Sequence, residues 1–220
     1  MSLEVKICGL ASPNVIDAAG KNGARWAGFV FFPPSPRYVD ARLAIDLAAI
    51  ARSHGMETVG VYVNPTDRLL DETAPAVDWI QLHGQETPER AQAIRAQSGK
   101  RLIKALPIAE AADVEAARTY EAVVDMILFD AKVQPGTTRL PGGNGRTFDW
   151  TLLEGRTPSL PWMLSGGLDA DNLAQAVLES GAKRVDVSSG LEDAPGLKSL
   201  DKIAQFMNHA RTLGPKEQTP

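Results

Sequence analysis

Short apolar runs alternate with longer helix-like segments along the whole chain. The runs are rich in Val, Ile and Phe, and most of them lack an alternation of apolar and polar residues, which is typical of strands buried on both faces. We predict eight strands, at residues 5–8, 26–32, 58–63, 79–83, 101–106, 126–130, 162–166 and 184–189. Eight such strands, each followed by a helical pattern, predict parallel βα units.

The segments between the runs begin like helices. Three of them pair an N-cap residue with a proline at the first helical position, at Ser12-Pro13, Asn64-Pro65 and Thr87-Pro88. Asp169 is placed to cap the helix that follows the seventh run. Apolar residues at helical spacing predict helices over 13–20, 40–52 and 199–211.

The length and the alternation predict an α/β fold, a single (β/α)₈ TIM barrel with parallel strands over residues 1–212, followed by a polar tail at 213–220. A doubly wound open sheet is the main alternative, but it would more naturally carry GxGxxG after the first strand, where this chain has CGLASP. The Gly- and Pro-rich stretch at 131–147 follows the sixth strand. We expect it to lie at the catalytic face and to close over a ligand.

Composition and charge narrow the function. The net charge of −4 argues against general nucleic-acid binding, so an anionic ligand would need local attraction from helix N-termini or a few placed Arg and Lys. One cysteine excludes an internal disulfide framework, and the first residues do not resemble a signal peptide. No apolar stretch is long enough to span a bilayer. We therefore expect a cytoplasmic protein that binds neither nucleic acid nor membrane.

Two reactive side chains lie at the predicted carboxyl ends of strands, where a barrel of this kind performs its chemistry. Cys8 ends the first strand, and Lys6, two residues earlier, points to the same side, where an ammonium favours thiolate. Asp130 ends the apolar sixth strand, where a carboxyl can hold its proton near neutral pH. A base and an acid facing each other across a mouth suit proton transfer, such as an aldose-to-ketose isomerisation. A buried structural cysteine and a turn-capping aspartate are the alternative interpretations.

Two glycine motifs follow the last two strands, where phosphate commonly binds in this fold. Backbone N–H groups in such loops bind anions, because glycine lets the chain approach closely. The residues concerned are Gly166 and Gly167 in LSGGL, and Ser188, Ser189 and Gly190 in VSSGLE. Each motif alone could be a tight turn, but the pair on adjacent strands favours phosphate binding.

Further polar residues are candidates for binding the rest of a ligand. Arg37, in a proline-stiffened loop, could pair with a carboxylate or be a solvated surface residue. His83 could orient a ligand or be a satisfied rim histidine. Asp186 could bind a ligand hydroxyl or hold Lys6 inside the barrel. The three histidines are far apart in sequence and lack metal-ligand spacing, so no metal site is predicted.

The motifs together resemble phosphoribosylanthranilate isomerase of tryptophan biosynthesis. The similarity runs in order from residue 5 to about residue 192 and rests on these segments: VKICGL, GFVFFPPSPRYV, VGVYVN, IQLHG, LFDAK, GGNGRTFDW, LSGGL and VDVSSGLE. The resemblance implies an Amadori rearrangement, without cofactor or metal, of N-(5-phosphoribosyl)anthranilate to 1-(2-carboxyphenylamino)-1-deoxyribulose 5-phosphate. It also implies a monomer or a homodimer.

The resemblance assigns roles to the candidate residues. Cys8 matches the general base of the family and Asp130 its general acid. Arg37 matches the arginine that binds near the anthranilate carboxylate, and the five Gly and Ser residues match its phosphate loops. We also predict that Lys6, His83 and Asp186 are substrate-binding residues.

Other functions on the same fold remain as alternatives. A histidine-pathway ribonucleotide isomerase resembles two half-barrels with an aspartate at each catalytic position, whereas this chain has Cys8 at the first and no clear internal repeat. A ribulose-phosphate epimerase would need a metal site. A sensor that binds a phosphorylated metabolite would need the phosphate loops, but neither an acid nor a base.

Overall fold

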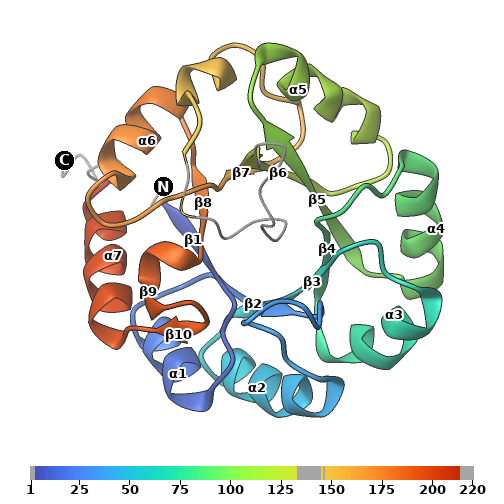
Figure 1. Ribbon diagram of the computed structural model, residues 1–220, viewed down its shortest axis with the longest axis vertical. Helices are drawn as coiled ribbons and strands as arrows, with labels where there is room; N and C mark the ends of the chain where they lie inside the picture. The colour runs from blue at the N-terminus through green and yellow to red at the C-terminus, as the bar shows by residue number, and fades with distance from the viewer. Residues whose placement is uncertain (1–2, 133–144, 146, 214–220) are drawn as a thin grey trace, which may run out of the picture.

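Eight parallel strands close into a barrel in chain order, with helices around it (Figure 1). The structure is a computed structural model and describes residues 3–132, 145 and 147–213. The barrel strands are β1 (Glu4–Cys8), β2 (Trp26–Val30), β3 (Glu57–Tyr62), β4 (Trp79–Leu82), β5 (Arg101–Ile108), β6 (Met126–Ala131), β7 (Trp162–Leu164) and β8 (Arg184–Val187). β1 pairs in parallel with both β2 and β8, which confirms the predicted barrel and excludes the open sheet.

Helices connect successive strands on the outside of the barrel. The α-helices are α1 (Pro13–Lys21), α2 (Ala41–Ser53), α3 (Asp67–Thr73), α4 (Pro88–Ser98), α5 (Ala111–Glu115), α6 (Leu173–Ser180) and α7 (Leu200–Thr212). Short 3₁₀ helices are η1 (Ala74–Ala76), η2 (Ala116–Tyr120), η3 (Trp150–Leu153) and η4 (Ser189–Leu191). Within the described ranges, no helix is long and apolar enough to cross a membrane.

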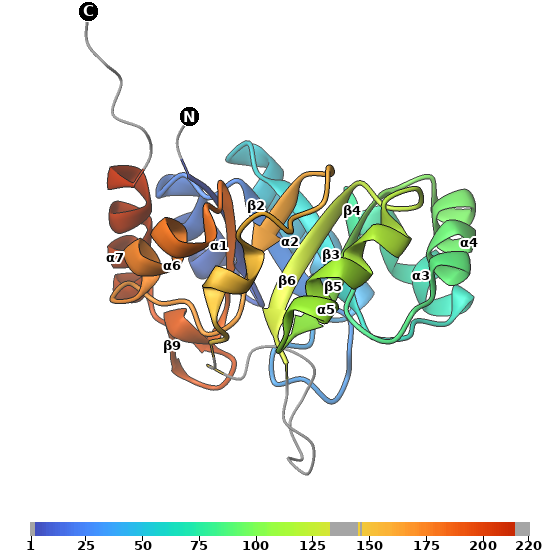
Figure 2. The same cartoon turned by 90° about the horizontal axis from the view of Figure 1, so that it is seen from above.

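A small hairpin that the sequence did not predict follows the last barrel strand. β9 (Glu192–Ala194) and β10 (Leu197–Lys198) pair antiparallel as a separate two-stranded sheet. Figure 2 shows β9 at the end of the barrel toward which the β6 arrow points. The hairpin therefore lies at the carboxyl ends of the strands.

Two sequence predictions fall on residues outside the described ranges. The predicted ligand-closing loop at 131–147 includes residues 133–144 and 146, and the predicted tail includes residues 214–220. Closure of the loop and the domain limit at residue 212 stay predictions.

Two helix starts differ from the sequence prediction because the expected caps have other partners. α3 begins at Asp67 with Thr66 as its N-cap, since Asn64 adopts a φ of 46° and its side chain accepts the N–H of Gln85. α6 begins at Leu173, because the Asp169 carboxylate accepts N–H groups within the preceding turn. Ser12 occupies its N-cap position without a side-chain capping bond, and Thr87 caps α4 as predicted.

Alternation along the strands divides the core into two layers. One face of each strand packs against the helices in a large apolar cluster that includes Ile7, Phe29 and Ile80. The other face fills the barrel interior, and this cluster consists of Trp26, Val59, Trp79, Ile103, Ala105, Met126, Leu128 and Met163. A packed interior of this kind leaves only the end of the barrel open for a ligand.

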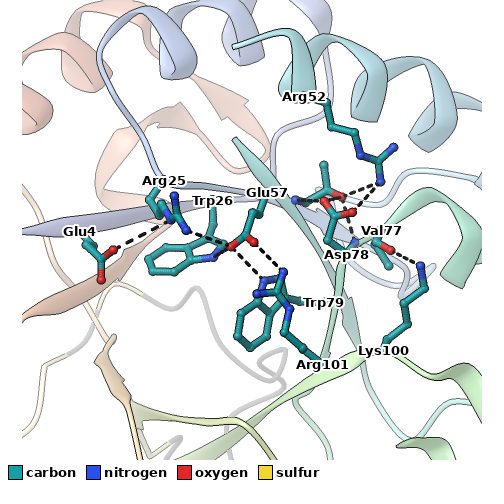
Figure 3. A network of polar contacts seen from close by, with 11 residues as sticks. Glu4, Arg25, Trp26, Arg52, Glu57, Val77, Asp78, Trp79, Lys100 and Arg101 are labelled. Atoms are coloured by element: carbon teal, nitrogen blue, oxygen red, sulfur yellow. Dashed lines mark hydrogen bonds and ion pairs between the residues drawn. The ribbon is translucent and has the colours of Figure 1, made fainter. Parts of the chain in front are cut away.

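Glu57 organises the opposite end of the barrel, at the start of β3 (Figure 3). Its carboxylate accepts hydrogen bonds from the indole N–H groups of Trp26, at 3.0 Å, and Trp79, at 3.2 Å, and from Arg101 at 2.6 Å. Burial alone would raise the pKa of Glu57, but hydrogen bonds from Arg101 and Trp79 and the charges of Arg101 and Arg25 lower it below its ordinary value. Glu57 is thus a carboxylate that accepts the hydrogen bonds of two buried indole N–H groups.

Replacing Glu57 with leucine is expected to lower the free energy of unfolding by about 2–4 kcal/mol, since two buried indole donors lose their acceptor. Urea denaturation measures this. Glu4→Leu is the matched control, because Glu4 pairs with Arg25 and Arg184 at the more exposed rim of the same end. The control is expected to cost about 1 kcal/mol or less. Equal losses in the two variants would contradict a central role for Glu57.

Candidate active site

A cavity opens at the carboxyl ends of the barrel strands. It encloses about 700 Å³, including space open to solvent, within the size range of small-molecule sites. Apolar residues of β2, β3 and the loops after them form part of its wall, namely Val30, Phe32, Val61, Val63 and, after β7, Leu168. The polar part of the wall contains a thiol, two carboxyls, an imidazole, a guanidinium and a group of small residues.

Cys8 ends β1 and reaches the cavity wall, with Lys6 below it. Both face the barrel interior around Gly28, where a methyl group would lie 3.2 Å from Lys6 Nζ and 3.3 Å from Cys8 Sγ. The Lys6 ammonium donates to Asp186 Oδ1 at 2.8 Å, and β1 pairs with β8 so that these two residues are in register. Ser165 Oγ donates to the other Asp186 oxygen at 3.3 Å. The buried ion pair of Lys6 and Asp186 thus lies directly below the Cys8 thiol.

Burial raises the pKa of the Cys8 thiol, against the lowering effects of the Lys6, Lys198 and Arg37 charges. The charge of Lys6 lowers the pKa of Cys8, as the sequence predicted, but burial has the larger effect and the net shift of the pKa is upward. Lys6 itself remains an ammonium: burial lowers its pKa, but the charge of Asp186 raises it above the ordinary value overall. A proton leaves Cys8 more readily once the cavity gains positive charge or loses negative charge.

Asp130 ends the apolar part of β6 and faces the same cavity. Its Oδ1 accepts the N–H of Ala131 at 2.9 Å, and its Oδ2 lies 3.2 Å from His83 Nε2. Gln81 Nε2 lies 2.9 Å from His83 Nδ1. Because an amide nitrogen can only donate, Nδ1 accepts and Nε2–H donates to Asp130. Both ring nitrogens of His83 therefore have partners within the protein.

Arg37 reaches the cavity from the loop after β2, where its side chain is 9% exposed. Two hydrogen bonds of 2.7 Å each, from Nε and Nη2, join it to the two oxygens of Glu192. Gly9 lies directly beneath: its φ is 78°, and a Cβ there would come within 2.6 Å of Arg37 Cδ. The glycine of the ICGL motif therefore makes room for the arginine.

The loops after β7 and β8 supply small residues and backbone N–H groups. Gly166 and Gly167 have φ values of 94° and 61°, which favour glycine, and a Cβ on Gly166 would meet the backbone of Ala131 at 2.7 Å. Gly190 packs against the neighbouring loop, since a Cβ there would meet Leu168 O. Ser188 Oγ donates to the carbonyl of Cys8 at 3.1 Å, which ties this loop to β1.

Most of the residues singled out from the sequence line this one cavity: Cys8, Arg37, His83, Asp130, Gly166, Gly167, Asp186, Ser188 and Ser189. Two do not line it. Lys6 is completely buried beneath Cys8, and Gly190 serves to pack two loops together. The alternative in which Asp186 holds Lys6 inside the barrel is confirmed.

Sequence reasoning missed Glu192, Lys198 and Gln81, which stand behind the cavity wall. Glu192 closes the VSSGLE motif, so its place after the eighth strand was a usable signal. Lys198 had no such signal, because its position depends on a two-residue strand. Gln81 could have been found because it lies on β4, two residues before His83, and so points to the same side as the residue that follows the strand. Over the described ranges, no group of three or more His, Cys, Asp or Glu residues could hold a metal ion.

The chain is similar to proteins of known family over nearly its whole length. The model of the N-(5'phosphoribosyl)anthranilate (PRA) isomerase family matches residues 5–209. An N-(5'-phosphoribosyl)anthranilate isomerase of Rhodospirillum centenum is 50% identical over 97% of this chain and 100% of that protein. The same-named protein of Paramagnetospirillum magneticum is 50% identical over 96% of this chain and 98% of its own length.

Solved structures agree with this similarity. Phosphoribosyl anthranilate isomerase from Thermotoga maritima superposes with a TM-score of 0.82 at 33% identity, over 96% of this chain and 100% of that one. A phosphoribosyl anthranilate isomerase in complex with reduced 1-(o-carboxyphenylamino)-1-deoxyribulose 5-phosphate has a TM-score of 0.80 at 31% identity, with the same coverage. A further Thermotoga maritima structure, at 32% identity and a TM-score of 0.79 over 96% of this chain and 100% of that one, is of monomers of the dimeric enzyme.

Proposed function

The chain belongs to the N-(5'-phosphoribosyl)anthranilate isomerase family, and from that premise we propose how its side chains divide the reaction. It is an enzyme that isomerises N-(5'-phosphoribosyl)anthranilate in tryptophan biosynthesis. We propose that Asp130 is the general acid and Cys8 the general base. One observation carries this proposal: a thiol at the end of β1 and a carboxyl at the end of β6 line a single cavity with an arginine and two glycine loops.

In the proposed chemistry, Asp130 gives one proton to the substrate and Cys8 takes one proton from it. Asp130 protonates the ribose ring oxygen, the bond from that oxygen to C1 breaks, and the nitrogen lone pair forms a Schiff base at C1. Cys8 then removes the proton from C2, and the electrons of that bond form an enolamine. The enolamine then gains a proton at C1 and loses the proton of its C2 hydroxyl, which yields the 2-ketone, 1-(2-carboxyphenylamino)-1-deoxyribulose 5-phosphate. Substrate and product are isomers, so no oxidant or reductant is required.

The remaining cavity residues are proposed to hold the two anionic ends of the substrate. Arg37 binds the anthranilate carboxylate, because a guanidinium matches a carboxylate in shape and charge. Backbone N–H groups near Gly166, Gly167, Ser188 and Ser189 bind the phosphate, and Gly190 allows the two loops to approach each other. The complex of a relative with a reduced carboxyphenylamino-deoxyribulose phosphate supports a ligand of this chemistry.

Three further candidates receive positioning or binding roles. His83 orients Asp130 through the 3.2 Å contact. Lys6 acts on the Cys8 thiol through its charge, and Asp186 holds Lys6 while its cavity face is placed to accept a hydrogen bond from a ribose hydroxyl. We also propose a cytoplasmic enzyme, as expected for amino-acid biosynthesis, that is a monomer or a homodimer.

A fluorescence assay tests the function. Phosphoribosylanthranilate is generated in situ, the protein is added, and loss of the anthranilate-type emission is followed over time. The expected result is an enzyme-dependent decay whose rate is proportional to protein concentration. A folded protein that leaves the emission unchanged, under conditions where the Thermotoga maritima isomerase removes it, would contradict the proposal.

A further inference from the structure

The hairpin formed by β9 and β10 contacts Arg37 on the side away from the cavity. Arg37 lines the cavity, whereas Glu192 and Lys198 stand outside its wall. The Arg37–Glu192 contact is a two-bond fork of 2.7 Å on each arm, with the two side chains 9% and 4% exposed. A guanidinium held in this way has a fixed plane before any ligand arrives.

Hydrogen bonds and a close backbone contact fix the hairpin beside the loops after β2 and β8. Lys198 Nζ donates to Glu192 Oε1 at 2.5 Å and to the Ser188 carbonyl at 3.0 Å. Gly196, in the turn, has a φ of 83° and donates its N–H to Glu192 Oε2 at 3.2 Å. A Cβ on Gly196 would lie 2.5 Å from the carbonyl oxygen of Pro36, so this turn packs against the residue next to Arg37.

Arg37, Glu192 and Lys198 form a cluster of three charged side chains, and its net charge depends on Lys198. Arg37 and Glu192 alone would form a neutral pair, which attracts an anion weakly. Lys198 is almost completely buried, with its side chain 1% exposed, and it leaves the three-residue cluster with one net positive charge. Lys198 also contacts Ser188, one of the proposed phosphate-loop residues. The cluster therefore joins the two regions that are proposed to bind the two ends of the substrate.

We propose that Glu192 is the positioning residue that aims Arg37 at the carboxylate of the substrate, with Lys198 keeping the cluster cationic. A long flexible side chain must be ordered when it binds a ligand, and prior ordering removes that cost from binding. Selectivity for a carboxylated aromatic ring then depends on a residue that never touches the ligand. This inference rests on the proposed role of Arg37.

Binding of two ligands that differ only in the carboxylate tests the inference. The probes are reduced 1-(o-carboxyphenylamino)-1-deoxyribulose 5-phosphate and its phenylamino counterpart without the carboxylate, measured by isothermal titration calorimetry. Glu192→Gln removes the fork, and Glu192→Asp keeps the charge but shortens the reach by one C–C bond, about 1.5 Å. Asp193→Asn is the matched control, because Asp193 is the next residue on β9 and its side chain is 56% exposed.

Both Glu192 variants are expected to lower the affinity for the carboxylated ligand about tenfold or more and the affinity for the carboxylate-free ligand by less than about threefold. The reason is that only the carboxylated ligand forms charged hydrogen bonds with Arg37. Asp193→Asn should change neither. Glu192→Asp keeps a counter-charge for Arg37 and Lys198, so it covers the case in which Glu192→Gln does not fold. Equal weakening of both ligands, or unchanged binding of the carboxylated one, would overturn the inference.

Arg37→Met separates this inference from the proposed function. If that variant loses its preference for the carboxylated ligand while the Glu192 variants keep theirs, the role of Arg37 stands and the positioning role of Glu192 is wrong. If Arg37→Met weakens both ligands equally, the assignment of Arg37 fails and the inference fails with it.

Discussion

Cys8→Ala is expected to lower kcat/KM by about 10³-fold, within the range that a lost general base costs an enzyme. Cys8 is the thiol at the cavity wall, and Lys6 and Asp186 form a buried ion pair beneath it. Alanine removes the group that takes the C2 proton, while the small change in volume leaves the barrel intact. Affinity for the reduced product analogue should change by less than about threefold, because Cys8 holds neither charged end of the ligand.

The pH dependence of the wild-type enzyme provides an independent check on Cys8. Burial raises the pKa of the thiol, so most molecules carry the neutral thiol at pH 7. A base works only in its deprotonated form, and the competent fraction grows as the pH rises toward that pKa. The rate at low substrate concentration should therefore increase from pH 6 to pH 8. Cys8→Ala activity close to wild type would remove Cys8 from the role of base.

The sequence was sufficient for the barrel because its signal is local. Eight short apolar runs reflect strands that are buried on both faces, and this pattern needs no knowledge of distant contacts. The candidate site followed from the fold, since the carboxyl ends of parallel strands meet at one mouth. Cys8 and Asp130 could therefore be placed in one cavity although 122 positions separate them in the chain.

Other parts of the site depend on contacts between distant side chains. The burial of Glu192 and Lys198 beside Arg37 depends on the hairpin, which the sequence did not predict. The upward shift of the Cys8 pKa could not be predicted, because the sequence showed the neighbouring Lys6 but not the depth of burial, which has the larger effect. Asn64 and Asp169 were taken as helix caps, whereas Asn64 accepts the N–H of Gln85 in the loop after β4 and Asp169 stabilises the turn before α6.

Asp130→Asn is the second substitution with a large expected effect, again about 10³-fold in kcat/KM. Asparagine preserves the shape of the side chain and can still contact His83, but it cannot donate a proton to the ribose ring oxygen. Ring opening should then become the slowest step. Binding of the reduced analogue and the melting temperature should stay near their wild-type values, since the variant leaves no buried charge unpaired.

Asp130, the proposed acid, is the first member of a short chain of contacts that continues through His83 to Gln81. With Gln81 Nε2 on His83 Nδ1, the ring donates Nε2–H to the Asp130 carboxylate. Gln81 Oε1 is buried without a hydrogen-bond partner among the described residues. Rotation of this amide would let Oε1 accept a proton from Nδ1–H, and His83 Nε2 would then accept the proton of a neutral Asp130.

Deuterium at C2 of the substrate ribose distinguishes the two steps. In Cys8→Ser the slow step is removal of that hydrogen, so deuteration should slow the residual reaction clearly. In Asp130→Asn ring opening precedes it and limits the rate, so deuteration should have little effect. Rates of the two variants with protiated and deuterated substrate, measured in the same fluorescence assay, check this. A strong isotope effect in Asp130→Asn would mean that proton removal at C2 still limits that variant, and Asp130 would then not be the acid that opens the ring.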